Sequence, residues 1–188
     1  MGLFILPPSQ VLAPYSDKKK GYKCVFMEKI ALGGGCHWCT EAVFQSLRGV
    51  DRVEQGFVAS TASHNTFSEA VIVHFKPERI TLKDLVEIHL HTHKSTSNHS
   101  MRDKYRSAVY SFSQRQHLDV IGLLKLLQKD FSAPLITQVL PFVSFKPSEA
   151  HFQNYYISNP EKPFCKAYIA PKLQLLLNQF RTLVVSVD

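Results

Sequence analysis

The sequence predicts a two-layer α/β sandwich, because strand patterns and helix patterns alternate along one chain of 188 residues. Strands are indicated by short runs rich in Val, Ile and Phe that alternate with polar residues, and helices by apolar residues recurring three and four positions apart. The composition agrees, with 45% hydrophobic and 20% charged residues, as in ordinary globular proteins. A chain of this length buries a sizeable core without disulfide support.

The first half of the chain begins with a strand, a glycine turn and a helix. A strand is expected over residues 27–32, which are followed by three consecutive glycines, and apolar residues then recur at helical spacing until Gly49 stops the pattern. Further strands are expected over residues 50–59 and 71–75, with Glu69 at the start of the latter.

The second half begins with a helix-start signal. The run Thr81-Leu82-Lys83-Asp84 is similar to a capping box, so a helix is expected from there to Leu90. A polar, irregular loop over residues 91–103 separates this helix from a strand over residues 107–112, and Ser113 then opens another helix.

The C-terminal third mixes weaker patterns. Residues 136–145 are typical of a strand that Pro141 interrupts, which indicates a sheet edge or a bulge. A short helix is expected over residues 148–156. The leucine-rich residues 173–180 predict a helix that docks on the rest of the chain.

Periodicity, charge and apolar runs limit the organisation of the chain. Residues 1–26 show no periodicity, so we expect a poorly ordered extension followed by one catalytic domain over residues 27–188. The net charge of +7 is spread along the chain, which argues against a nucleic-acid partner. No run approaches the roughly 18 apolar residues of a membrane span. We therefore expect a monomer in the cytoplasm.

Cys36 is the leading candidate for chemistry. The strand, glycine turn and helix around it place this cysteine at a helix N-terminus, where unpaired N–H groups and the helix dipole favour a thiolate. Thiol pKa values in such positions fall from about 8.5 to roughly 3.5–7.5. A buried, inert structural cysteine is the alternative.

Two other interpretations of the cysteines stay open. Four cysteines are too few for a disulfide scaffold, and Cys36 and Cys39 have the Cys-x-x-Cys spacing of a general thiol–disulfide oxidoreductase. In the second of these interpretations the chain is a non-catalytic zinc-binding module, in which the two cysteines bind zinc together with nearby histidines, namely His89, His91, His93 and His99. The histidine spacing matches no standard zinc pattern.

Six blocks of sequence carry a family resemblance. In chain order they are residues 34–44, 47–50, 68–71, 104–110 and 153–155, and the Asn159-Pro160 step that leads to Cys165. In these blocks the chain resembles the A-type peptide methionine sulfoxide reductases (MsrA), whose signature is Gly-Cys-Phe-Trp followed by a helix. The resemblance covers roughly residues 27–170. It implies a ferredoxin-like split β-α-β core with added helices and an irregular C-terminal tail.

The resemblance implies an antioxidant repair enzyme that reduces the S epimer of methionine sulfoxide, free or in proteins. Cys36 then has the position of the nucleophile, and Glu69 has that of the acid that protonates the oxygen. The attack leaves a sulfenic acid on the cysteine and releases methionine. No bound cofactor and no metal are implied, only an external, thioredoxin-like dithiol that reduces the resulting disulfide.

Two cysteines compete to resolve the sulfenic acid. Cys165 matches the family's C-terminal resolving cysteine, which lies on a flexible tail, and we favour it. Cys39 is the local rival, at a position where many family members carry glycine. Access and contact between sulfur atoms decide such exchange more than closeness in sequence.

Three aromatic positions are implied to bind the substrate. Trp38 has the position of the family's platform for the methyl group, and Tyr105 that of a tyrosine that holds the sulfoxide oxygen. His37 stands where the family usually has phenylalanine. It is expected to stack on the substrate or to tune the thiolate.

The chain also departs from the family pattern in two places. The loop over residues 58–66 is shorter than in the family and lacks its oxygen-binding tyrosine. The Gly-Asn-Asp motif before residue 104 is missing, with Asp103 as the candidate replacement for its aspartate. Donors to the oxygen are therefore expected from His37 or His99.

Overall fold

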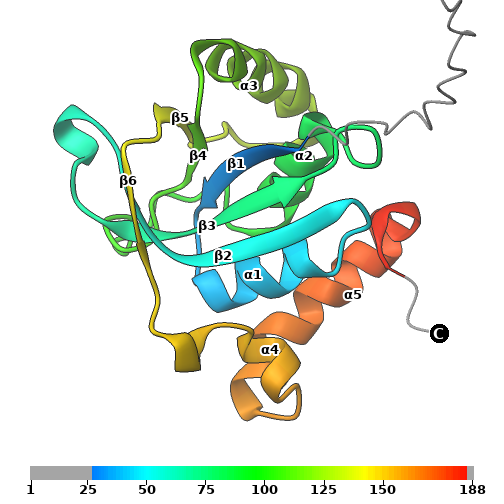
Figure 1. Ribbon diagram of the computed structural model, residues 1–188. Coiled ribbons are helices and arrows are strands. Elements are labelled where there is room, and N and C mark those ends of the chain that lie inside the picture. Colours follow the sequence, from blue (N-terminus) through cyan, green and yellow to red (C-terminus); the bar gives the residue numbers. More distant parts are fainter. Residues whose placement is uncertain (1–26, 186–188) are drawn as a thin grey trace, which may run out of the picture.

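A computed structural model describes residues 27–185, and these form a mixed β-sheet with helices packed on it (Figure 1). Within these residues the sheet has six strands in the order β5-β4-β1-β3-β2-β6. The strands are β1 (Glu28–Gly33), β2 (Val50–Ala59), β3 (Ser68–Phe75), β4 (Ala108–Ser111), β5 (Gln138–Pro141) and β6 (Ser144–Pro147). The helices are α1 (His37–Gln45), α2 (Leu82–Thr92), α3 (Gln114–Leu127), α4 (Tyr155–Ser158), a π-helix (Cys165–Ile169) and α5 (Ala170–Gln179).

The ends of the chain fall outside this description. The extension predicted for residues 1–26 lies outside the described residues. None of the helices in the described part is long and apolar enough to cross a membrane.

The inner four strands confirm the predicted ferredoxin-like core. They have the order β4-β1-β3-β2, and each is antiparallel to its neighbours. Helix α1 connects β1 to β2, and α2 connects β3 to β4, so each helix crosses the strand that lies between the two strands it joins. This connection pattern is the split β-α-β arrangement that the family resemblance implies.

The main core lies between the sheet and the helices, as the two-layer prediction requires. Alternate residues of β3, including Val71, Val73 and Phe75, face this core and are fully buried. The residues between them, such as Ala70 and Ile72, belong to a smaller apolar cluster on the opposite face. The period of two that predicts the strand from sequence therefore also divides its side chains between the two faces.

The strand predicted over residues 136–145 is two strands at opposite edges of the sheet. Strand β5 pairs in parallel with β4 and ends at Pro141, whereas β6 pairs antiparallel with β2. Proline has no N–H to donate to a neighbouring strand, so the chain leaves the β5 edge there and crosses to the other edge. The prediction of edge position is confirmed, and the prediction of one interrupted strand is wrong.

Residues 148–156 do not form the single short helix that the sequence predicts. A 3-10 turn at Ala150–Phe152 is followed by Asn154, which has a φ of 55°, and only then by α4. A left-handed residue interrupts a right-handed helix, and asparagine tolerates this conformation better than most residues. The turn that results directs the chain back towards α1.

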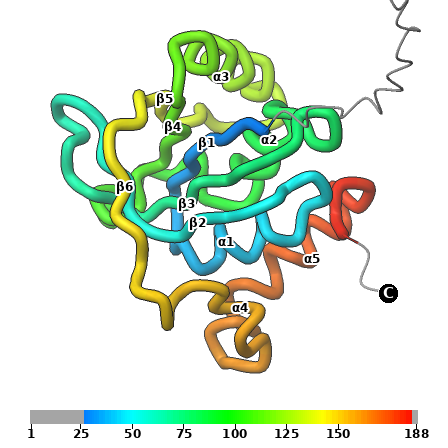
Figure 2. Tube along the Cα trace, in the orientation of Figure 1, coloured from blue at the N-terminus to red at the C-terminus, as the bar shows by residue number. Residues whose placement is uncertain are grey.

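The chain beyond residue 164 is helical, so the irregular tail expected there is wrong. The π-helix and α5 pack against α1 (Figure 2). The predicted docking helix is confirmed as α5, where Leu176 is fully buried in the main core. Cys165 is the first residue of the π-helix and is fully buried. The flexible tail expected to carry this cysteine is therefore also wrong.

Both predicted helix starts are confirmed by their caps. The Thr81 side chain accepts a hydrogen bond from the Asp84 N–H, and the Asp84 carboxylate accepts one from the Thr81 N–H, which completes the capping box. The Ser113 hydroxyl accepts a hydrogen bond from the Gln116 N–H at the start of α3. Such local signals are readable from sequence because both partners lie within one turn of helix.

Candidate active site

The turn between β1 and α1 presents Cys36 at the start of the helix. Cys36 is the N-cap, with φ of −56° and ψ of 125°, and its carbonyl accepts hydrogen bonds from the N–H groups of Cys39 and Thr40 at 3.1 Å each. Gly34 has a φ of 158°, and an added Cβ would lie 2.4 Å from the His93 ring. Only glycine fits there.

The surroundings of the Cys36 sulfur favour the thiolate. The pKa of the Cys36 thiol is lowered, first because the Cys39 thiol donates a hydrogen bond to it and further by the N–H groups of Cys39 and Trp38. Burial and the negative charge of Glu69 oppose this effect. The side chain is half-buried, so a stabilised thiolate remains accessible.

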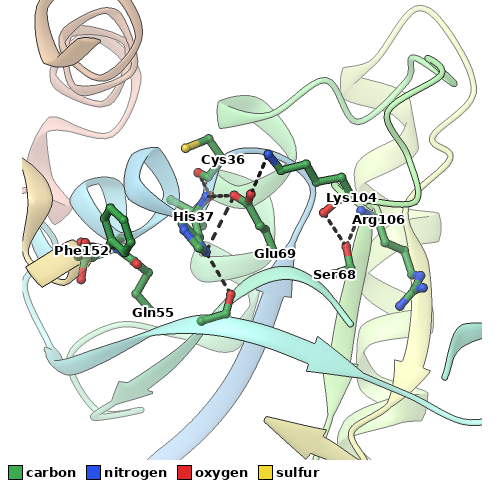
Figure 3. Close-up of polar contacts among 11 residues, drawn as sticks. Cys36, His37, Gln55, Ser68, Glu69, Lys104, Arg106 and Phe152 are labelled. Atoms are coloured by element: carbon green, nitrogen blue, oxygen red, sulfur yellow. Dashed lines mark hydrogen bonds and ion pairs between the residues drawn. The ribbon is translucent and has the colours of Figure 1, made fainter. Parts of the chain in front are cut away.

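Glu69 lies beside the nucleophile, at the start of β3. Its buried carboxylate accepts a hydrogen bond from the His37 N–H at 3.0 Å and lies 3.4 Å from the Lys104 ammonium (Figure 3). The first contact uses an N–H of the first turn of α1, which has no partner within the helix. The nucleophile and the predicted acid are thereby held at the same helix terminus.

His37 forms a wall of the site. The ring is buried, with Nδ1 3.0 Å from the Gly56 carbonyl oxygen and 3.8 Å from the Glu69 carboxylate. Its edge packs against Phe57 at 5.2 Å between ring centres. The contact with a carbonyl requires a proton on Nδ1, so this nitrogen donates to the protein.

Trp38 is surrounded by three aromatic rings from the C-terminal part of the chain. Its ring stacks on Tyr155 with 4.2 Å between centres and an interplanar angle of 4°. Phe152 lies tilted at 5.7 Å, and Phe164 presents its edge at 5.3 Å. The indole N–H is buried without a hydrogen-bond partner among residues 27–185. The predicted methyl platform thus has one face covered by the protein itself.

Tyr105 is linked to Glu69 by the side chain of Lys104, its neighbour in sequence. The Lys104 ammonium lies 5.1 Å from the centre of the Tyr105 ring and also pairs with Glu69. A hydrogen bond with the Tyr105 hydroxyl and the charge of Glu69 raise the pKa of Lys104. Within the described residues, His99 makes no hydrogen bond to Glu69 or Cys36. Asp103 is exposed.

Three free cysteines gather beside α1. Cys39 and Cys165 are buried in one small apolar cluster, and Cys36 packs against it. The Cys165 sulfur lies 3.4 Å from the Asn159 carbonyl oxygen, and the Cys39 sulfur lies 3.9 Å from that of Tyr168. The hydrogen bond to Cys36 and burial raise the pKa of Cys39, and burial raises that of Cys165. Both predicted resolving thiols are therefore near the nucleophile and protonated.

The sequence reasoning missed several residues that support this site. The Arg102 guanidinium donates to the carbonyl oxygens of Gly34 and Tyr105, and so holds the glycine turn. Lys172 on α5 donates to the Thr92 carbonyl, and its positive charge acts to lower the pKa of Cys39. Glu41 is a further supporting residue that was missed. It alone had a signal in the sequence, because it lies one turn after Trp38 on the predicted helix.

The histidines of the zinc interpretation have other partners. His89 and His93 stack with 4.1 Å between ring centres, and His93 bonds the His89 carbonyl and the Ser107 hydroxyl. His91 packs against Phe131. Within residues 27–185 no group of three metal-binding side chains is placed to hold an ion. The zinc-binding interpretation is therefore not favoured.

A free thiol at a helix start, next to a buried carboxylate, defines the class as a thiol-dependent oxidoreductase with a ferredoxin-like core. A sequence model of the family "Peptide methionine sulfoxide reductase" matches residues 28–183. The chain therefore belongs to the peptide methionine sulfoxide reductase family. The resemblance of the six sequence blocks is confirmed, and with it the oxidoreductase class.

Bacterial relatives cover most of the chain. It is 31% identical to peptide methionine sulfoxide reductase MsrA of Acinetobacter baumannii (strain SDF), over 84% of this chain and 98% of that protein. The MsrA of Deinococcus radiodurans is 36% identical, over 79% of this chain and 80% of that protein.

Solved structures share the fold. Reduced Mxr1 of Saccharomyces cerevisiae matches with a TM-score of 0.66 and 22% identity, covering 80% of this chain and 96% of that one. Methionine sulfoxide reductase A of Corynebacterium diphtheriae matches with a TM-score of 0.62 and 22% identity, covering 71% and 76%.

The buried histidine pair predicts a loss of stability in acid. Burial lowers the pKa of His93 to about 4 and that of His89 well below 6.5, whereas both rings titrate near 6.5 in the unfolded chain. Below about pH 6.5 the unfolded chain therefore binds more protons. The free energy of unfolding should fall by up to about 1.4 kcal/mol per pH unit for each histidine, down to about pH 4.

Urea unfolding at pH 7, 6 and 5 measures this slope. His89→Phe keeps an aromatic ring against Phe44 and removes one titrating group, so the loss between pH 7 and 5 should be smaller than in the wild type. An equal loss in both proteins would exclude His89 as a source of the acid sensitivity.

Proposed function

We propose that this chain reduces the S epimer of methionine sulfoxide, free or in proteins, with Cys36 as nucleophile and Glu69 as proton donor. One contact carries the proposal: the Glu69 carboxylate accepts the N–H of His37, the residue next to the nucleophile. The Cys36 thiol, which loses a proton, and the Glu69 carboxyl group, which gives one to the substrate, are thereby held at one helix terminus. Membership of the reductase family supports the same assignment.

The first half of the reaction transfers oxygen from substrate to enzyme. Glu69 takes up the proton of the Cys36 thiol, and the thiolate attacks the sulfur of the sulfoxide to form an S–S bond while Glu69 returns that proton to the oxygen. The hydroxyl then moves to the Cys36 sulfur as the S–S bond and the S–O bond to the substrate break, which leaves a cysteine sulfenic acid and releases methionine with its sulfur reduced. One thiol and one sulfoxide thus give one sulfenic acid and one thioether.

The aromatic side chains supply the apolar part of the substrate site. Trp38 is two residues after Cys36 in the first turn of α1, so in the proposal the methyl group of a substrate whose sulfur reaches Cys36 lies against the indole. The Lys104 ammonium lies between Glu69 and the ring of Tyr105. In the proposal these groups face the sulfoxide oxygen, and they take the role that the sequence assigned to His37 and His99.

The second half of the reaction forms a disulfide. Cys39 is one helical turn after Cys36, and Cys36 packs against the apolar cluster that contains it, so in the proposal the Cys39 thiol attacks the sulfenic sulfur and water is released. Cys165 packs against Cys39 in the same cluster, and its thiolate then exchanges into the Cys36–Cys39 bond at the Cys39 sulfur. In this order both predicted resolving cysteines take part.

A dithiol protein is the proposed reductant of the final disulfide. Mxr1 of Saccharomyces cerevisiae has been solved in complex with Trx2 and matches this fold with a TM-score of 0.55 at 21% identity, covering 73% of this chain and 91% of that one. A thioredoxin-type partner restores the thiols by exchange and needs no bound cofactor. We place the enzyme in the cytoplasm as part of this proposal, since its thiols need a reducing compartment.

Glu69→Gln separates this function from general disulfide exchange. The variant should reduce methionine S-sulfoxide about 10²–10⁴-fold more slowly, since it lacks the proton donor. Its reduction of a disulfide substrate such as insulin should be retained. The measurement is turnover of the two separated sulfoxide epimers with dithiothreitol, with Cys36→Ser as the inactive control. Equal rates on both epimers, or no loss in Glu69→Gln, would refute the assignment.

Serine variants test the order of the disulfides. After one turnover without reductant, Cys165→Ser should contain a Cys36–Cys39 disulfide, because the local thiol still reacts. Cys39→Ser should retain the sulfenic acid for longer than the wild type. Mass spectrometry of the alkylated protein identifies both products. A persistent sulfenic acid in Cys165→Ser would show instead that Cys165 resolves it directly.

A further inference from the structure

Glu41 is a buried carboxylate that the proposed reaction does not use. It lies on α1 with 1% of its surface exposed. Its two oxygens accept hydrogen bonds from the Asn154 N–H at 2.9 Å, the Tyr155 N–H at 3.2 Å and the Gln55 side-chain amide at 2.9 Å. A buried charge is retained only when donors compensate its loss of water. Two of these donors belong to backbone more than 110 residues away in sequence.

The backbone that Glu41 holds carries the rings around Trp38. Residues 152–164, here termed the covering segment, supply Tyr155, whose ring stacks on the indole, and both flanking phenylalanines. Gln55, which Figure 3 shows beside Phe152, donates to the Phe152 carbonyl at 3.0 Å and also to Glu41. The covering segment therefore lies on the indole because a carboxylate one helical turn away fixes its backbone.

The left-handed residue of the covering segment makes this contact possible. Asn154 has a φ of 55°, and the turn it forms presents two successive N–H groups to one carboxylate. Its side-chain oxygen also accepts a hydrogen bond from Gln45 on α1 at 2.7 Å. Hydrogen bonds to an ionised acceptor are about twice as strong as neutral ones. Glu41 is thus the strongest anchor of the segment on α1.

We propose that Glu41 is a positioning residue for substrate binding: it seats Tyr155 on one face of Trp38 and so fixes the indole for the methyl group of the substrate. This inference rests on the proposed function. An indole held by a stacked ring has one orientation before the substrate arrives, so binding does not have to order it. Loss of the anchor should therefore raise KM and leave the chemistry at Cys36 unchanged.

The protein reports this coupling through its own fluorescence, because it contains one tryptophan. Glu41→Gln keeps the shape of the side chain, but its amide group cannot accept both backbone N–H groups. In this variant Trp38 emission should shift to longer wavelength and acrylamide quenching should increase. Tyr155→Ala should give the same change, whereas Tyr155→Phe keeps the stacked ring and should match the wild type.

Kinetics on methionine sulfoxide then separate a positioning role from a structural one. Glu41→Gln and Tyr155→Ala should each raise KM about tenfold, with kcat and the alkylation rate of Cys36 within about twofold of the wild type. The double variant should show no further increase, since both changes release the same contact. Glu149→Gln is the matched control, because Glu149 is exposed and precedes the covering segment. Its KM, kcat and rate of Cys36 alkylation should equal those of the wild type.

An unchanged KM in folded Glu41→Gln, or effects that multiply in the double variant, would overturn the inference. If Glu41→Gln does not fold, half-buried Tyr155→Ala decides the question by the same measurements. A wild-type protein without sulfoxide reductase activity would refute the proposed function. The fluorescence of the variants would still show whether Glu41 seats Tyr155 on Trp38.

Discussion

The stabilisation of the Cys36 sulfur at the start of α1 is the interaction on which the other features depend. The Cys39 thiol and the N–H groups of the first turn lower the pKa of Cys36, against the cost of burial and of the nearby Glu69 charge. These partners all belong to one helical turn. Its position is set by a glycine turn with no room for a side chain at Gly34 and by Arg102, which donates to the Gly34 carbonyl.

The topology of the sheet explains how the acid comes to the nucleophile. Strands β1 and β3 are adjacent in the split β-α-β arrangement, and their register pairs Gly33 with Ala70. The end of β1 is therefore beside the start of β3, where Glu69 precedes Ala70. Two residues that are 33 positions apart in sequence meet because the crossover through α1 and β2 places β3 next to β1. The core fold and the proposed chemistry thus have a common origin.

Local signals allowed much of this structure to be predicted from sequence. The capping box at Thr81, the cap at Ser113 and the helix start at Cys36 depend on residues within one turn of each other. The period of two in β3 gave its buried face, and the Cys-x-x-Cys spacing gave the Cys36–Cys39 contact. The family resemblance supplied the acid and the strand order, which no local pattern contains.

The predictions that were wrong concern contacts between distant segments. Pro141 marked an edge, but nothing nearby in sequence indicated that the chain would cross to the opposite edge. Cys165 was expected on a flexible tail, yet the π-helix and α5 bury it against α1. The stacking of Tyr155 on Trp38 depends on Glu41 and on a left-handed asparagine. Each contact is visible only after the fold brings its partners together.

The ionisation of Cys36 is the most direct test of this account. The rate of iodoacetamide alkylation at this residue, followed by mass spectrometry as a function of pH, gives the pKa of its thiol. The account predicts a value below the roughly 8.5 of a free cysteine, and a higher value in Cys39→Ala, whose side chain cannot donate a hydrogen bond. A wild-type value at or above 8.5, unchanged in Cys39→Ala, would contradict it.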